Sequence, residues 1–196
     1  MPVLCCGASA GKPERTMDIL LLGPTGGGKS LLAKQLAKAV HGEALPGNVY
    51  TKPESGMEVH RTVLTAAKPA VRVTLREIGG VMGMDWGPQF AHADLVLFVV
   101  DAADRASVSR ALAQLLEALA TDGLRTTPVA VCWNKCDLAF ALDAAQLADL
   151  FRLDAVEARH QGPISRFSVS AVSGSGIDSL CAFVLQTTRE RARTAA

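Results

Sequence analysis

Short apolar runs alternate with longer amphipathic segments along the chain, and this alternation predicts its secondary structure. Residues 17–22 and 94–101 are almost continuously apolar and have the length of strands, which is typical of central strands covered on both faces. Residues 59–65 and 71–77 are rich in β-branched side chains and are separated by a short segment that contains Pro69, so we expect a hairpin. Residues 129–133 and 166–170 are the remaining predicted strands.

The segments between these strands carry apolar residues at helical spacing. Helices are predicted at residues 31–40, 106–121, 143–153 and 177–191, and loops at 41–56 and 79–88. Strands that alternate with helices predict an α/β fold, with a mostly parallel sheet covered by helices on both faces. Because no linker or repeat interrupts the pattern, we expect one domain over residues 17–192. Residues 1–16 show no periodicity and are interpreted as a flexible tail.

The most specific motif follows the first predicted strand. Residues 23–30 read Gly-Pro-Thr-Gly-Gly-Gly-Lys-Ser, the pattern of a phosphate-binding loop. Its glycines let several backbone N–H groups point at one anion, and the helix that follows adds the positive end of its dipole. Lys29 is expected to reach the β- and γ-phosphates, and the Ser30 hydroxyl to ligate Mg²⁺. The predicted contacts in this segment are Thr25, Gly26, Gly27, Gly28, Lys29, Ser30 and Leu31.

A second motif indicates which base is bound. Residues 134–137 read Asn-Lys-Cys-Asp, directly after a predicted strand. Guanine presents two donors, N1–H and the exocyclic amine, to a carboxylate, so Asp137 is given that role. The Lys135 stem is expected to pack on the base, and Asn134 to tie this loop to the phosphate loop. Residues 170–172, Ser170, Ala171 and Val172, would add a backbone N–H to the base pocket. The three motifs together favour GTP over ATP.

Composition and charge narrow the choice of partners. The chain has 196 residues, 49% hydrophobic and 20% charged, which is a globular composition. Its net charge of +1 gives no reason to expect nucleic acid as a partner. No apolar run approaches the ~20 residues that span a bilayer, and no secretory signal is expected. Cys132 and Cys181 lie in apolar segments and are predicted to be core residues in a cytoplasmic, reducing setting.

The order of these motifs resembles that of Ras-superfamily GTPases, and finer features resemble the Arf-like branch. Residues 77–80, Glu-Ile-Gly-Gly, look like that branch's Asp-x-Gly-Gly, and Trp86 is placed like the tryptophan of its second switch. Residues 98–105 are similar to the family segment Phe-Val-Val-Asp-Ser-x-Asp-Arg. The resemblance covers residues 17–190. It implies a six-stranded P-loop G domain that binds GTP or GDP with Mg²⁺, with Gly80 beside the nucleotide.

The resemblance also implies partners and a setting. An effector protein would dock on the switch regions, and an exchange factor or an activating protein would set the nucleotide state. The function would be a nucleotide-dependent switch in membrane or ciliary protein traffic, with Golgi or cilium association. Cys5 and Cys6, on a tail with Lys12 and Arg15, suggest palmitoylation and peripheral membrane association, and an unmodified exposed tail is the alternative.

Three positions in the switch regions depart from the family pattern. Met57 stands where the switch I threonine is sought, and Thr51 is the alternative for that place. Glu77 replaces the aspartate that holds Mg²⁺ through a water, and Val81 replaces the glutamine that orients the attacking water. The motifs for binding are intact while those for hydrolysis are weakened. We therefore expect slow intrinsic hydrolysis, and the alternative is a GTP-bound scaffold that stabilises a partner complex and rarely turns over.

Overall fold

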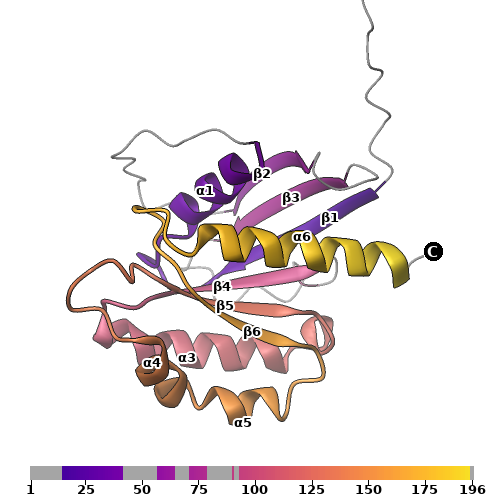
Figure 1. Cartoon of the computed structure of the whole chain (residues 1–196). Helices are drawn as coiled ribbons and strands as arrows, with labels where there is room; N and C mark the ends of the chain where they lie inside the picture. Colours follow the sequence, from indigo (N-terminus) through magenta and orange to yellow (C-terminus); the bar gives the residue numbers. More distant parts are fainter. Residues whose placement is uncertain (1–14, 42–56, 65–70, 79–89, 91–92, 195–196) are drawn as a thin grey trace, which may run out of the picture.

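A single six-stranded sheet forms the centre of the molecule (Figure 1). The computed structural model describes residues 15–41, 57–64, 71–78, 90 and 93–194. The strand order is β2-β3-β1-β4-β5-β6, and β2 alone runs antiparallel to its neighbour. The expected six-stranded, mostly parallel sheet is confirmed. The strands are β1 (Arg15–Leu22), β2 (Met57–Leu64), β3 (Val71–Ile78), β4 (Leu95–Asp101), β5 (Val129–Asn134) and β6 (Ile164–Ser168).

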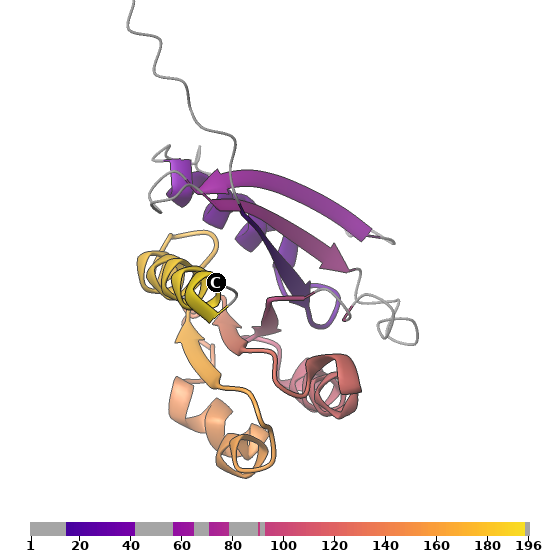
Figure 2. The same cartoon turned by 90° about the vertical axis from the view of Figure 1, so that its right-hand side faces the viewer.

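Helices cover both faces of this sheet (Figure 2). One face carries α1 and α6, and the other carries α3, α4 and α5. The central strands β1, β4 and β5 are therefore buried on both faces, as strands of a parallel sheet require. The helices are α1 (Lys29–His41), α3 (Arg105–Ala120), α4 (Ala144–Phe151), α5 (Leu153–Glu157) and α6 (Ile177–Thr194), with a 3₁₀ turn η1 (Asp122–Leu124) after α3.

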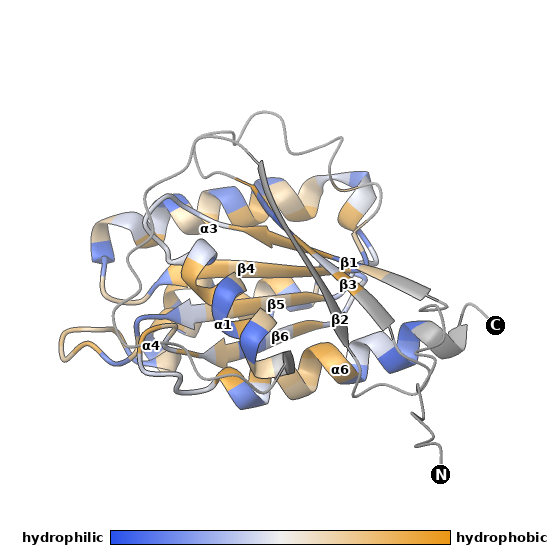
Figure 3. Ribbon diagram, turned by 90° about the horizontal axis from the view of Figure 1, so that it is seen from above, coloured by the Kyte–Doolittle hydropathy of each residue, from blue (hydrophilic) through white to orange (hydrophobic). Residues whose placement is uncertain are grey.

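The alternation of side chains along each strand divides the core into two clusters. On β4, Val96, Phe98 and Val100 pack toward α3, whereas Leu95, Leu97 and Val99 pack toward α1 and α6. The central strands are accordingly apolar along their length, while each helix presents a mixed surface (Figure 3). The predicted core positions of Cys132 and Cys181 are confirmed, and burial raises the pKa of the Cys132 thiol to about 12.

Two elements, the helix expected at residues 143–153 and the last strand, differ from the prediction for local reasons. The helix expected at residues 143–153 is two helices, because Arg152 adopts the left-handed conformation (φ 46°, ψ 45°), which ends α4 and redirects the chain into α5. The last strand, expected at residues 166–170, lies two residues earlier, because Ser170 begins a turn in which its carbonyl accepts from the Gly174 N–H at 2.9 Å.

The first strand is longer than predicted. It begins at Arg15 and pairs with β3 from that residue onward, so the last two residues of the expected tail belong to the sheet. The hairpin expected from residues 59–77 is confirmed as β2 and β3, which pair antiparallel from Met57 opposite Ile78 to Leu64 opposite Val71. Residues 1–14 of the predicted tail, residues 42–56 of the first predicted loop and the whole second predicted loop, residues 79–88, lie outside the described residues.

Candidate nucleotide site

The sequence motifs meet at one edge of the sheet, where the parallel strands end. The phosphate loop follows β1, the segment 134–137 follows β5, and the segment 170–176 follows β6. The strand order places β1 between β3 and β4, so the strand order reverses at β1. The chain leaves β1 at this topological switch point. In open α/β sheets, ligands bind in the crevice at this position. The topology therefore gathers three distant segments at the usual place for a ligand.

The phosphate loop packs so tightly that two of its glycines cannot be replaced. Gly23 has φ 132°, and a Cβ placed on it would lie 2.1 Å from the Val99 carbonyl oxygen on β4. Gly28 has φ 88°, and a Cβ there would lie 2.3 Å from the Asn134 amide nitrogen. Both positions combine a conformation that favours glycine with a contact closer than any side chain tolerates. The loop is thus pressed against β4 on one side and against the 134–137 segment on the other.

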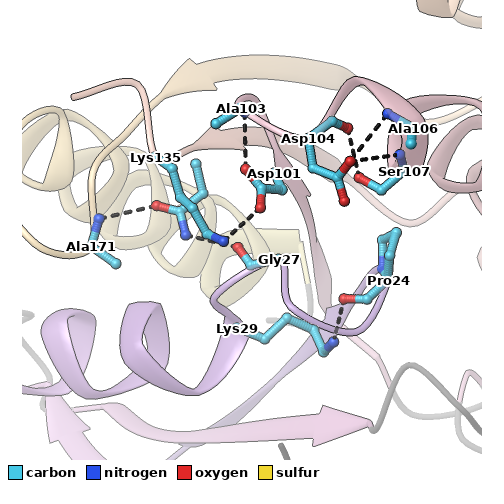
Figure 4. Close-up of polar contacts among 11 residues, drawn as sticks. Pro24, Gly27, Lys29, Asp101, Ala103, Asp104, Ala106, Ser107, Lys135 and Ala171 are labelled. Carbon is cyan, nitrogen blue, oxygen red and sulfur yellow. Dashed lines mark hydrogen bonds and ion pairs between the residues drawn. The ribbon is translucent and has the colours of Figure 1, made fainter. Parts of the chain in front are cut away.

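Lys29 begins α1 and folds back over the loop (Figure 4). Its side chain is buried, and Nζ donates to the carbonyl oxygens of Gly23 at 2.9 Å and Pro24 at 3.0 Å. Burial lowers the pKa of the ammonium, and the nearby negative charge of Glu77 opposes this shift. A buried cation in a curled glycine loop is an arrangement in which an anionic ligand is stabilised.

Ser30 and Glu77 place two hard oxygen ligands next to each other. The Ser30 hydroxyl donates to Glu77 Oε1 at 2.8 Å, and the Glu77 side chain is only 8% exposed. Glu77 reaches this position from the end of β3, where it lies opposite Leu21 of β1. A hydroxyl and a carboxylate are ligands that suit Mg²⁺, which usually takes one or two carboxylates plus phosphate and water oxygens.

No other metal site is evident in the described part of the chain. Among those residues, no group of three His, Cys, Asp or Glu side chains lies close enough to hold a metal by itself. Ser30 and Glu77 fit Mg²⁺ as a metal that is shared with phosphate oxygens.

Asn134 joins all three motifs through one amide. Its side chain is 1% exposed; Nδ2 donates to the Gly27 carbonyl at 2.8 Å, and Oδ1 accepts from the Ala171 N–H at 3.0 Å. The sequence prediction that Asn134 ties its loop to the phosphate loop is confirmed. Since the contact to Gly27 spans 107 residues, it fixes the phosphate loop relative to the base segment.

Gln35 is a second connection that sequence reasoning missed. It lies on α1, and its Nε2 donates to the Ala171 carbonyl at 2.8 Å, so both backbone groups of Ala171 are held by amide side chains. The two residues are 136 positions apart, and a single glutamine in an amphipathic helix gives no sign of such a role. Only the fold reveals this contact.

Lys135 and Asp101 form an ion pair at the edge of the site (Figure 4). Lys135 has the left-handed conformation (φ 66°), and its Nζ lies 2.5 Å from Asp101 Oδ2. Asp101 also accepts from the Ala103 N–H at 2.9 Å. This pairing of Asp101, which ends β4, was not predicted from the sequence. It anchors the Lys135 side chain by its ammonium, so the aliphatic stem is held in one position.

The remaining predicted site residues divide into exposed and buried groups. Asp137, Thr25 and Val172 are exposed, Val172 to 70%, whereas Ser170 is fully buried and its Oγ accepts from the Ser173 N–H at 2.9 Å. Gly26 is also exposed, and Leu31 is half-buried on α1. Gly80 lies outside the described residues, as do Thr51 and Val81.

Comparison with known proteins agrees with the arrangement of these motifs. The ADP-ribosylation factor family model matches residues 6–188. The chain belongs to the ADP-ribosylation factor family. Within this family it is 33% identical to human ADP-ribosylation factor-like protein 16 over 177 residues, which cover 87% of the chain and 85% of that protein. It is 32% identical to ADP-ribosylation factor-like protein 1 of Caenorhabditis elegans over 166 residues, 84% of each chain.

The fold is shared with a solved structure of an Arf-like protein. The Arl6 (BBS3) small GTPase from Trypanosoma brucei, determined with the bound nucleotide analogue GppNp, matches with a TM-score of 0.74. The match covers 90% of this chain and 98% of that one, at 22% sequence identity. The G-domain fold predicted from the sequence is therefore confirmed, and membership of the family makes this chain an Arf-like small GTPase of the GTP-binding switch type. Among the described residues, no helix is long and apolar enough to cross a membrane.

Proposed function

We propose that this Arf-family chain binds GTP with Mg²⁺ at the site above, hydrolyses it slowly, and acts as a nucleotide-dependent switch. The observation that carries the proposal is the double hydrogen bond of Asn134, which fixes the phosphate loop against the base segment. A rigid relation between these two segments is what a ligand with a phosphate at one end and a base at the other requires.

The exposed face of the base segment supports recognition of guanine. Asp137 lies two residues after the anchored Lys135 and is exposed. Its carboxylate can therefore accept hydrogen bonds from the N1–H and the exocyclic amine of guanine. The Ala171 N–H is already taken by Asn134, so we assign the contact to guanine O6 to the next backbone donor, that of Val172. Charge-assisted hydrogen bonds to the base are each worth about 1.5–3 kcal/mol, which is enough to discriminate between bases.

The Ser30–Glu77 pair supports a modified magnesium site. When bound, Mg²⁺ supplies positive charge that neutralises the phosphate oxygens. Ser30 and Glu77 would hold it, and the extra methylene of glutamate lets this carboxylate reach the serine hydroxyl directly at 2.8 Å.

Slow hydrolysis follows from the chemistry at position 81. Val81 has neither a donor nor an acceptor in its side chain, so it cannot orient an attacking water. A partner that supplies an arginine can raise such rates by about 10³–10⁵-fold, which leaves an activating protein as one way to complete the cycle. Exchange of nucleotide through an exchange factor is the other way.

A second candidate function has the same residues in its favour. Val81, Glu77 and Met57 together would keep the chain loaded with GTP, as a scaffold that stabilises a partner complex. Turnover separates the two functions, because a switch releases phosphate when an activating partner is added and a scaffold does not. In either case we place the chain in membrane or ciliary traffic on its family relationship, with an effector bound through the switch regions.

Peripheral membrane attachment is a separate part of the proposal. It rests on Cys5 and Cys6, since two acyl chains are needed for stable attachment. Mass spectrometry of the native protein would show two palmitoyl groups, and two unmodified thiols would remove attachment by this route. The proposed setting is the cytoplasm, at the Golgi or the cilium.

Substitution of Asp137 by asparagine tests the assignment of the base. The amide replaces one acceptor by a donor, so the variant should lose about 100-fold or more in GTP affinity and gain affinity for xanthosine triphosphate, whose C2 carbonyl accepts that donor. Fluorescent analogues of both nucleotides measure this exchange, with Asp143→Asn, at the cap of α4, as the control. An equal loss for both nucleotides would show that Asp137 does not read the base.

A further inference from the structure

A groove between α3 and α5 lies on the face of the sheet opposite α1 and α6. It encloses about 570 Å³, within the range of known ligand pockets. The described residues that line it come from α3, η1, the α4–α5 corner, α5 and the segments that follow η1 and α5, and none belongs to the loops of the nucleotide site. This α3–α5 groove has the following apolar lining: Leu112, Leu116, Leu119, Phe151, Ala155 and Val156.

Apolar side chains of α3 and α5 form the walls of the α3–α5 groove, and the sheet does not bury them completely. Leu112, Leu116 and Leu119 recur at positions i, i+4 and i+7 along α3, so they share one face of that helix. Leu116 is 47% exposed, which is unusual for a leucine on a stripe that otherwise packs on the core. Apolar surface in a concave site favours binding of another apolar surface.

The floor of the groove is rigid. Phe151 is fully buried and makes an edge contact with Trp133, with ring centroids 4.9 Å apart. Trp133 is 1% exposed and belongs to the central strand β5. This packing fixes the Phe151 ring to the central sheet.

The rim of the groove is basic. Arg125, Arg152 and Arg159 line it, against one acidic side chain, Asp122, which lies 3.5 Å from Arg125. The chain as a whole carries a net charge of only +1, so this concentration of arginines is local. Arginine is the cation most suited to binding carboxylates at an interface, because its planar fork donates two parallel hydrogen bonds.

The acidic residues of α5 are directed away from the groove. Asp154 and Glu157 both bind Arg166 of β6, each at 2.7 Å, and neither lines the groove. The groove side of the same short segment carries Arg152 and Arg159 instead. Acidic and basic side chains are thus separated on the two sides of α5, and the basic side faces the groove.

We propose that the α3–α5 groove docks an amphipathic helix of a partner protein that carries acidic residues beside its apolar stripe. The lining residues of α3 extend over about 12 Å of helix, at 1.5 Å per residue, which matches about two turns of a third helix, and the five-residue α5 forms the opposite wall over about 7 Å. Apolar residues of the partner fill the space between α3 and α5, and its carboxylates bind the arginines at the rim.

A pair of designed peptides tests this proposal on the full-length chain. The first is a helical 18-residue peptide with leucines at helical spacing flanked by glutamates, and the second has lysines in place of the glutamates. Fluorescence anisotropy should show binding of the glutamate peptide only. Leu116→Glu should weaken this binding about tenfold or more, because it places a charge in the apolar wall.

Leu150→Glu is the matched control. Leu150 is 53% exposed on α4, close to the exposure of Leu116, but it does not line the groove. Its substitution should leave peptide affinity within about twofold of the parent chain. Retention of bound guanine nucleotide by both variants checks that they are folded, since the nucleotide site shares no residue with the groove.

A charge exchange makes the test independent of any loss of folding. The double variant Arg152→Glu with Arg159→Glu should lose the glutamate peptide and bind the lysine peptide. Equal weakening by Leu116→Glu and Leu150→Glu, or equal binding of both peptides to the parent chain, would overturn the proposal. The proposal would also be overturned if the chain bound neither peptide but formed a dimer in sedimentation that depends on Leu116, because the occupant would then be a second copy. Binding to phosphatidylserine vesicles that depends on Leu116, again without peptide binding, would make the occupant a membrane.

Discussion

At the scale of single residues, the site depends on side chains that hold its other parts in place. Asn134, Gln35 and Asp101 each hold a loop or another side chain in place, and only the contact made by Asn134 was predicted from the sequence. Gln35 and Asp101 act through contacts between distant segments, 136 and 34 residues apart, so no local pattern marks them. Residue types that carry chemistry are visible in a sequence, whereas residues that position them require the fold.

Removal of the Asn134 amide should weaken nucleotide binding and also lower the free energy of unfolding. Asn134→Ala leaves the buried Gly27 carbonyl and Ala171 N–H without their partner, at about 1–3 kcal/mol for each group. We expect the free energy of unfolding in urea to fall by about 2–4 kcal/mol and nucleotide to be lost during purification. Cys136→Ala, in the same segment, should change neither. A stable Asn134→Ala variant that keeps its nucleotide would contradict the role assigned to this side chain.

The charge of Glu77 should matter more than its length. Glu77→Gln keeps a hydrogen-bond acceptor near Ser30 but removes the negative charge, so nucleotide-loaded protein should require about tenfold more Mg²⁺ to retain its ligand. Glu77→Asp keeps the charge and should stay within a few-fold of the parent. The measurement is the Mg²⁺ concentration at half-release of a fluorescent nucleotide in metal buffers. If the glutamine variant behaves like the parent chain, Glu77 does not contribute to metal binding.

At the scale of helices and strands, hydrophobic periodicity predicted the six strands and the helices α1, α3, α4 and α6, but it missed α5 and η1 and the points where elements end. The helix predicted at 143–153 is interrupted because Arg152 takes a left-handed conformation, which few non-glycine residues adopt and which no pattern of apolar residues encodes. The strand predicted at 166–170 is shifted because the turn that starts at Ser170 competes with the ladder. Periodicity reports burial, while the ends of elements are set by individual hydrogen bonds.

The start of α3 offers a direct measure of such a hydrogen bond. Asp104 caps this helix, since its side chain accepts from the N–H groups of Ala106 and Ser107. Asp104→Ala should lower the free energy of unfolding by about 1 kcal/mol, as measured by urea denaturation. Asp122→Ala is the control, because Asp122 is 93% exposed. An equal change in both variants would indicate a general effect of charge rather than loss of the cap.

At the scale of the whole molecule, the strand order explains why sequence motifs far apart can act together. The phosphate loop, the 134–137 segment and the 170–172 segment are separated by more than 30 residues each, yet they meet because β1, β5 and β6 end at the same edge of one parallel sheet. The same order leaves the α3–α5 groove remote from that edge. The molecule can therefore bind a nucleotide at one place and a helical partner at another.

The nucleotide bound to freshly purified protein, and its fate over hours with Mg²⁺, tests the central claim most directly. The nucleotide is released, identified by chromatography and compared with samples kept at 25 °C with added GTP. The account predicts guanine nucleotide in the site and GTP that persists over hours without a partner. Bound GDP with steady turnover would contradict the assigned effect of Val81 and Glu77, and ATP or no guanine nucleotide at any concentration would contradict GTP binding itself.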